Sequence, residues 1–148
     1  EEIGLLGSEA YTQKPIFRID STVIVINLDI VGRESKKKPN ERILFIDGKE
    51  KYSNFIEILR SFNQNGEQII NPNGLDDATL FSISDHTSFQ QKDVPAFLVN
   101  TGIHKDYHQP TDTQEKLNYA NIASIYELML KTIYHLSTTP NPLEELKE

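Results

Sequence analysis

The arrangement of apolar residues along the chain constrains its fold more than any other feature. Short apolar runs rich in β-branched residues alternate with stretches in which apolar residues recur every three or four positions. The run at residues 23–31 lacks strict apolar–polar alternation, which is typical of a strand buried on both faces, and the run at 43–46 predicts another buried strand. Residues 96–99 predict a strand introduced by Pro95. The periodic stretches predict amphipathic helices. Strands that alternate with helices predict an α/β fold with a largely parallel sheet.

The sequence also predicts the helices, one further strand and the segments that connect them. The sequence predicts helices at residues 5–12, 52–62, 85–92 and 119–134, and a short strand at 67–71. Residues 103–117 have little periodicity and many polar groups, so we expect an ordered loop there. The tail from residue 138 is rich in proline and glutamate, and we expect residues 138–148 to fray.

The helix at residues 119–134 has the strongest amphipathic pattern in the chain. Asn118 precedes it and is a suitable N-cap, because an asparagine side chain can accept a hydrogen bond from the first turn. The predicted apolar face consists of large or aliphatic side chains: Tyr119, Ile122, Ala123, Tyr126, Met129, Leu130, Ile133 and Tyr134.

Composition excludes several classes of function. The 148 residues suit one domain, and the formal net charge of -7 argues against a nucleic-acid-binding surface, which needs a basic face. The sequence has no cysteine, so neither disulfides nor thiolate metal sites can form. No apolar run approaches the roughly 20 residues of a membrane-spanning helix.

Four short segments carry acidic and histidine side chains that suit metal chemistry: residues 1–2, 27–29, 84–86 and 107–112. In open α/β sheets, ligands bind outside the carboxyl ends of the strands. Asp29 lies near the end of one predicted strand, and the loop at residues 104–108 follows the end of another. The sequence therefore predicts a metal site at the carboxyl edge of the sheet.

Each segment taken alone also has a plainer interpretation. Glu1 and Glu2 could be solvated acids in a first helical turn, where the helix dipole favours negative charge. Asp29 could hydrogen-bond the backbone at the end of its strand, or pair with Arg33. His108 could be an exposed loop histidine with no ligand. The residues alone leave these alternatives open.

Together, the segments resemble the motifs of the co-catalytic zinc aminopeptidases. The matching motifs are EEIGLLGS (1–8), NLDIVGR (27–33), SDHTSF (84–89) and YHQPTD (107–112), in this order. The family includes bacterial leucyl-type aminopeptidases, glutamate carboxypeptidase and, more distantly, glutaminyl cyclase and transferrin receptor. The resemblance implies a three-layer sandwich of the phosphorylase/hydrolase-like type, with a mostly parallel central sheet flanked by helices.

The resemblance also implies roles for individual residues around a pair of zinc ions. Glu1 matches the general base that activates the metal-bridging water. Glu2 matches a ligand of one zinc ion, and Asp29 and His108 match terminal ligands, one for each metal. Tyr107 matches the tyrosine that stabilises the tetrahedral intermediate.

The resemblance also bears on the segment at residues 84–86. Asp85 matches a buried acid that orients a metal ligand. We interpret His86, its neighbour, as a structural residue.

The chain departs from the family pattern at its beginning. The family's other metal ligands, a histidine and a bridging aspartate, lie upstream of the paired glutamates. We therefore expect residues 1–148 to be the carboxyl-terminal part of the catalytic domain, incomplete at its N-terminal side and inactive alone. Its expected partners are the missing N-terminal part of the same domain and a peptide substrate. Apolar faces should then lie exposed or be covered by a partner. Secretion or periplasmic location is typical of the family's bacterial members.

The resulting prediction is a metallo-aminopeptidase, a hydrolase that cleaves the peptide bond next to a free N-terminus. Carboxypeptidase or dipeptidase action stays open. A glutaminyl cyclase-like acyltransferase is the first alternative, but those members carry tryptophan before the histidine ligand, where this chain has Tyr107. A metal-free receptor or scaffold domain is the second, and the retention of Glu1, Glu2, Asp29 and His108 argues against it.

Overall fold

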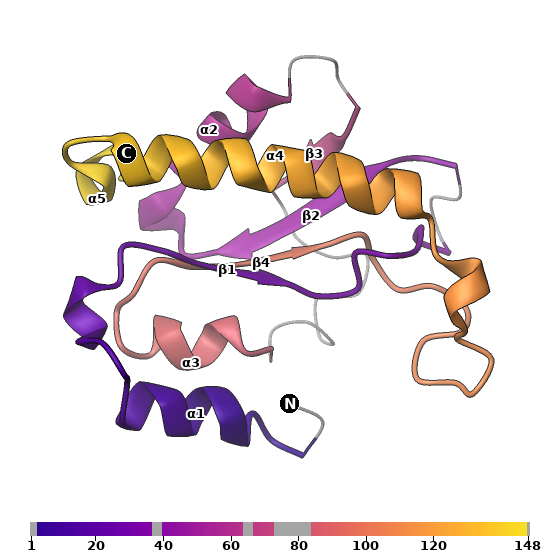
Figure 1. The fold of residues 1–148 in the computed structure, drawn as a ribbon, viewed down its shortest axis with the longest axis horizontal. Coiled ribbons are helices and arrows are strands. Elements are labelled where there is room, and N and C mark those ends of the chain that lie inside the picture. Colours follow the sequence, from indigo (N-terminus) through magenta and orange to yellow (C-terminus); the bar gives the residue numbers. More distant parts are fainter. Residues whose placement is uncertain (1–2, 37–39, 64–66, 73–83, 148) are drawn as a thin grey trace.

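The computed structural model describes residues 3–36, 40–63, 67–72 and 84–147. In this part of the chain a central sheet lies between two layers of helices (Figure 1). The strands follow the spatial order β1-β4-β2-β3. They are β1 (Val25–Leu28), β2 (Ile43–Gly48), β3 (Ile69–Asn71) and β4 (Ala96–Asn100). β1 is parallel to β4 and β2 to β3, whereas β2 runs antiparallel to β4. The α/β prediction is confirmed, with a mixed sheet.

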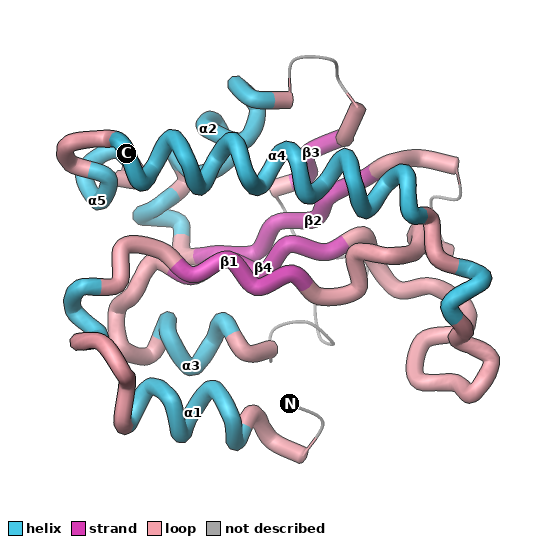
Figure 2. The backbone as a smooth tube through the Cα atoms, viewed as in Figure 1, coloured by secondary structure: helices cyan, strands magenta, loops and turns pink. Residues whose placement is uncertain are grey.

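The helices divide between the two faces of the sheet (Figures 1 and 2). One face is covered by α2 (Asn54–Phe62), α4 (Tyr119–Thr138) and α5 (Pro142–Glu145). On the other face α3 (His86–Gln90) packs against β1 and β4, and α1 (Leu6–Gln13) packs against α3. Short 3-10 turns occur at η1 (Ile19–Ser21), η2 (Glu50–Tyr52) and η3 (Gln114–Lys116). The three-layer arrangement is confirmed, and α1, α2, α3 and α4 lie where helices were predicted. Among the described residues, no helix is both long and apolar enough to cross a bilayer.

The core lies between the inner strands β2 and β4 and the helices α2 and α4. All five residues of β4 are buried, as are the first four of β2. Phe55 of α2 stacks on Phe97 of β4, with 4.0 Å between the ring centroids. Burial of each such side chain stabilises the fold by about 1.5–3 kcal/mol. The prediction of a buried strand at residues 43–46 and that of a strand at 96–99 are therefore confirmed.

The first predicted strand differs from its expectation. Residues 23–31 were expected to be buried on both faces, but β1 spans only Val25–Leu28 and its side chains are half-buried or exposed. Leu28 is 45% exposed. β1 is the outer strand of the described sheet, so fewer neighbouring elements cover its side chains than cover those of β4.

The predicted apolar face of α4 is wrong for most of its residues. Tyr119, Tyr126, Leu130, Ile133 and Tyr134 are exposed, Tyr126 by 63%. Met129 is buried as predicted. The other buried residues of the helix were not in the predicted face: Asn121, Ile125, Leu128, Thr132 and Leu136. Apolar residues occur all round this helix, so periodicity alone cannot select the packed face, and contact with α2 and the sheet decides it. The N-cap prediction is confirmed, because the Asn118 side chain accepts from the Asn121 amide at 3.0 Å.

The C-terminal tail also differs from its expectation. Instead of fraying, it forms α5, and Leu146 beyond it is fully buried against the core. Pro142 occupies the start of α5, where a missing amide hydrogen costs nothing and the fixed φ favours a helix. His135 of α4 and Glu145 of α5 pair at 2.6 Å. The proline that suggested an irregular tail is instead a helix-initiating residue.

Candidate metal centre at the sheet edge

The ends of β1 and β4 meet at one edge of the sheet. Leu28 is in register with Val99, and the Asp29 amide donates to the Val99 carbonyl at 3.1 Å. After β4 the chain turns at Gly102, where φ is +86° and a Cβ atom would lie 2.9 Å from the Ser35 side chain. Because the strands are parallel, Asp29 and the loop that follows β4 begin at the same end of the sheet (Figure 1).

Asp29 is half-buried, and a short hydrogen-bond chain holds its carboxylate. The Ser84 hydroxyl donates to Asp29 Oδ2 at 3.2 Å, and Asn27 Nδ2 donates to the Ser84 oxygen at 2.7 Å. Ser84 itself is buried. The chain of contacts joins β1 to the segment that enters α3 and fixes the direction of the Asp29 side chain.

The backbone directly after Asp29 is strained. Ile30 has a φ of 51°, a left-handed conformation that is rare for a β-branched residue. Thr101 compensates for it, because its amide and its hydroxyl both donate to the Ile30 carbonyl, at 3.1 and 2.6 Å. The same hydroxyl also contacts the Arg33 carbonyl. Strain of this kind persists only where surrounding contacts hold it, and it is common at functional sites.

Tyr107 and His108 lie in the loop after β4. Their rings stack with centroids 3.8 Å apart and planes inclined by 20°. Tyr107 is half-buried and His108 is exposed, with a left-handed φ of 56°. Two turn hydrogen bonds shape this loop, from the Tyr107 amide to His104 and from the Gln109 amide to Asp106.

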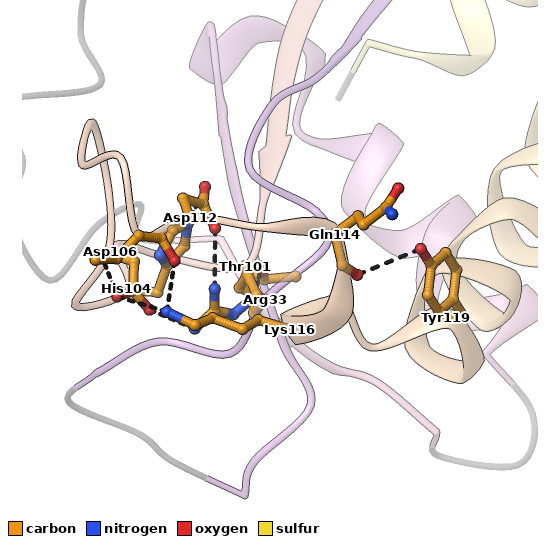
Figure 3. A network of polar contacts seen from close by, with 9 residues as sticks. Arg33, Thr101, His104, Asp106, Asp112, Gln114, Lys116 and Tyr119 are labelled. Atoms are coloured by element: carbon orange, nitrogen blue, oxygen red, sulfur yellow. Dashed lines mark hydrogen bonds and ion pairs between the residues drawn. The ribbon is translucent and has the colours of Figure 1, made fainter.

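A group of charged and polar side chains packs beneath this loop (Figure 3). We call it the Arg33 cluster, and it consists of Arg33, His104, Asp106, Thr111, Asp112 and Lys116. Arg33 Nη2 donates to Asp106 and Nη1 to Asp112, both at 2.9 Å. Thr111 and Lys116 donate to the other oxygen of Asp106, at 2.7 and 3.0 Å. The Thr111 hydroxyl, followed by Lys116 and Arg33, holds the pKa of Asp106 well below its usual value.

His104 forms the inner side of the cluster. Its ring is buried, and Nε2 lies 3.6 Å from Asp112 Oδ2. Burial lowers the pKa of His104, and the nearby Asp112 carboxylate opposes that shift only in part. The ring also meets Tyr107 edge-on, at 6.3 Å between centroids. His104 is therefore a buried ring that packs edge-on against the Tyr107 side chain.

The remaining predicted residues have different outcomes. Glu1 and Glu2 lie outside the described residues. Asp85 occupies the N-cap of α3 and is half-buried rather than buried, and its side chain makes no capping bond. His86 is fully buried, and its Nε2 lies 3.4 Å from Asp47 Oδ2 without the alignment of a hydrogen bond. That position agrees with a structural residue.

The alternative partner weighed for Asp29 is not observed. Arg33 turns toward Asp106 and Asp112, while Asp29 takes its hydrogen bond from Ser84. Arg33 thus does not neutralise the Asp29 carboxylate.

The donor chemistry of the site fits zinc. Asp29 offers carboxylate oxygens and His108 an imidazole nitrogen, both of which zinc binds in proteins. Within residues 3–36, 40–63, 67–72 and 84–147, no three His, Asp or Glu side chains gather closely enough to hold a metal ion. Asp29 and His108 are the donors that the described residues could contribute.

Sequence reasoning gave no role to several residues that shape this edge. Asn27 and Ser84 belong to the recognised motifs, so their presence there was a usable signal. Thr101, Asp106 and Lys116 lie in stretches without periodicity or motif, and no sequence signal marked them.

Comparison with known proteins agrees with this geometry. The sequence model of peptidase family M28 matches residues 1–133. The chain belongs to peptidase family M28. A curated relative, the uncharacterized protein YfbL of Escherichia coli (strain K12), is 34% identical over 55 residues, which cover 35% of this chain and 17% of YfbL.

Two bacterial aminopeptidases are among the solved structures with a similar fold. BSAP, a zinc aminopeptidase from Bacillus subtilis, superposes with a TM-score of 0.70 at 22% identity, over 90% of this chain and 33% of BSAP. The LapA aminopeptidase of Legionella pneumophila gives a TM-score of 0.69 at 19% identity, over 93% of this chain and 37% of LapA. The chain thus spans about a third of the length of these proteins, and the likeness shows a shared fold.

Proposed function

We propose that the protein is a zinc-dependent exopeptidase of family M28, an aminopeptidase that hydrolyses the peptide bond next to a free N-terminus. The observation that carries the proposal is that Asp29 follows β1 and the loop with Tyr107 and His108 follows β4, so that both begin at the same end of these parallel strands. This is the edge at which ligands bind in open α/β sheets. The family match makes a hydrolytic metal site the best explanation for these side chains.

Asp29, His108 and Glu2 are the residues that would hold zinc. The Asn27–Ser84–Asp29 hydrogen bonds support a ligand role for Asp29, because ligating carboxylates are themselves hydrogen-bonded. The stacked Tyr107 ring restricts the orientation of the His108 imidazole. When bound, zinc supplies Lewis acidity, which polarises the substrate carbonyl and acidifies a water molecule.

The chain's own side chains would then move protons and stabilise charge. In this proposal Glu1 takes a proton from the attacking water and delivers it to the leaving amine. The Tyr107 hydroxyl donates a hydrogen bond to the oxyanion that develops on the scissile carbonyl. Asp85 would orient a metal ligand without binding the metal itself.

The test is a comparison of Glu1→Gln with Glu9→Gln in the intact protein. Glu9 is an exposed acid on α1 and provides the matched control. We expect Glu1→Gln to abolish hydrolysis of aminoacyl 4-nitroanilides while zinc content stays at the wild-type level, and Glu9→Gln to change neither. Loss of zinc together with activity would refute the assignment of Glu1 as base.

The type of exopeptidase is tested with blocked peptides. An aminopeptidase must leave an N-acetylated peptide intact and still cleave one whose carboxyl terminus is an amide. The opposite pattern would assign carboxypeptidase action instead. Absence of zinc and of any hydrolysis would favour the metal-free scaffold alternative.

A further inference from the structure

The Arg33 cluster joins the two segments that carry the candidate ligands. Arg33 follows Asp29 by four residues, and Asp106 precedes His108 by two. The Arg33 guanidinium spans the gap with separate nitrogens, Nη2 on Asp106 and Nη1 on Asp112, each at 2.9 Å. The loop that presents Tyr107 and His108 is therefore held from both of its sides by one side chain (Figure 3).

The ion pair of Arg33 and Asp106 is almost fully buried, which argues that it does more than stabilise the fold. The side chains of Arg33 and Asp106 are only 13% and 9% exposed. Taking charges out of water is costly, and buried ion pairs are often no more stabilising than apolar residues of similar size. What a planar arginine fork does provide is direction, because it holds two acceptors at once in a fixed geometry.

The backbone of Arg33 is also held in place, by Thr101. Its carbonyl is contacted by the Thr101 hydroxyl, which also holds the left-handed Ile30 next to Asp29. A displacement of the loop at residues 104–112 would therefore shift the backbone next to Asp29 through Arg33. A displacement of that backbone would likewise shift the loop. On the other side of the cluster, Lys116 Nζ and the Thr111 hydroxyl keep Asp106 in place at 3.0 and 2.7 Å.

We propose that Arg33 is a positioning residue, whose bridge to Asp106 and Asp112 holds Tyr107 and His108 in place relative to Asp29. The inference rests on the proposed function for its catalytic consequence, but not for its structural one. Arg33 contacts carboxylates of its own chain. Its loss should therefore lower turnover without a matching change in substrate binding.

The test uses Arg33→Lys and Arg33→Ala, with Arg60→Lys as the matched control. Lysine keeps the charge but cannot bridge two carboxylates with one rigid fork. Arg60 also makes an ion pair, with Glu57 at 2.6 Å, but on the exposed surface of α2. All variants are examined in the intact protein.

The first readout needs no metal. Hydrogen–deuterium exchange of the backbone at residues 104–112 is measured in zinc-free protein by mass spectrometry. We expect exchange there to be faster by about tenfold in both Arg33 variants and unchanged in Arg60→Lys, since local opening follows the loss of contacts that hold a segment. Wild-type exchange rates in this loop in both Arg33 variants would overturn the proposal.

The second readout is catalytic. We expect kcat to fall by about 10–100-fold in Arg33→Lys, the range found for residues that support metal ligands, with KM within about twofold of wild type. Millimolar guanidinium, but not ethylammonium, should restore part of the kcat of Arg33→Ala. A higher KM at unchanged kcat, or the absence of guanidinium rescue, would contradict a positioning role.

The two readouts separate this inference from the proposed function. If the wild-type protein binds no zinc and cleaves no peptide, the proposed function fails, while the exchange experiment still decides whether Arg33 holds the loop. If the wild type is an active zinc peptidase and Arg33→Lys matches it in exchange and in kcat, only the positioning role fails.

Discussion

Replacement of Thr101 by valine tests how the two ligand-bearing segments are held together. Valine keeps the shape of the buried side chain and removes only its hydroxyl, which donates to the carbonyls of Ile30 and Arg33. The backbone amide of residue 101 still donates to Ile30 at 3.1 Å in the variant. The Ile30 carbonyl therefore keeps one partner, whereas the Arg33 carbonyl loses the Thr101 hydroxyl.

The magnitude follows from the loss of this one donor. The hydroxyl has a single proton, which the two carbonyls share, so the variant loses the equivalent of one hydrogen bond. A hydrogen bond contributes about 0.5–1.5 kcal/mol net, and an acceptor left buried without a partner costs about 1–3 kcal/mol. The added methyl group recovers part of the loss. We therefore expect the free energy of unfolding to fall by about 1–2 kcal/mol.

Urea unfolding followed by far-ultraviolet circular dichroism measures this change. Thr138→Val is the control, because the Thr138 hydroxyl is exposed and bonds only carbonyls of its own helix, those of Tyr134 and His135. The control should change the free energy of unfolding by less than about 0.5 kcal/mol. Equal effects of the two substitutions would refute the role assigned to the Thr101 hydroxyl.

Two further predictions concern the C-terminal segment. Leu146→Ala should lower the free energy of unfolding by about 2–5 kcal/mol, because Leu146 is fully buried. The control Leu143→Ala, at a position that is 39% exposed, should lower it far less. Similar urea midpoints for the two variants would contradict the packing of the C-terminal segment against the core. The hydrogen bond from His135 lowers the pKa of Glu145. The pairing therefore contributes stability above the unfolded-state pKa of Glu145, near 4.5, and loses it as the pH falls. Glu145→Gln should flatten the fall in melting temperature below that pH, and an unchanged pH profile would contradict the assignment.

The sequence was enough to predict those elements whose local apolar pattern agrees with their environment in the fold. Residues 43–46 and 96–99 are continuous apolar runs, and both became inner strands covered on both faces. The position of Asp29 followed from the rule that polar residues at parallel strand ends share one edge. Fold class and this edge of the site could therefore be predicted without coordinates.

Where the local pattern was ambiguous, tertiary contacts decided the outcome. In α4 both the exposed Tyr126 and the buried Ile125 fit an apolar stripe, and only packing distinguishes them. The Arg33 cluster brings together side chains up to 83 positions apart, with Arg33 at one end and Lys116 at the other. Arginine was considered as a partner for Asp29, so the residue type was informative, but its true partner depends on a loop path that no periodicity encodes.

The central claim is that Asp29 and His108 hold zinc at the end of β1 and β4. The most direct test is elemental analysis of zinc bound to the intact protein after dialysis, compared among wild type, Asp29→Ala, His108→Ala and the control Asp93→Ala. Asp93 is an exposed acid that pairs with Lys51. The account predicts that Asp29→Ala and His108→Ala each bind less zinc than wild type and that Asp93→Ala binds as much. Equal zinc content in all four proteins, or no zinc in the wild type, would contradict it.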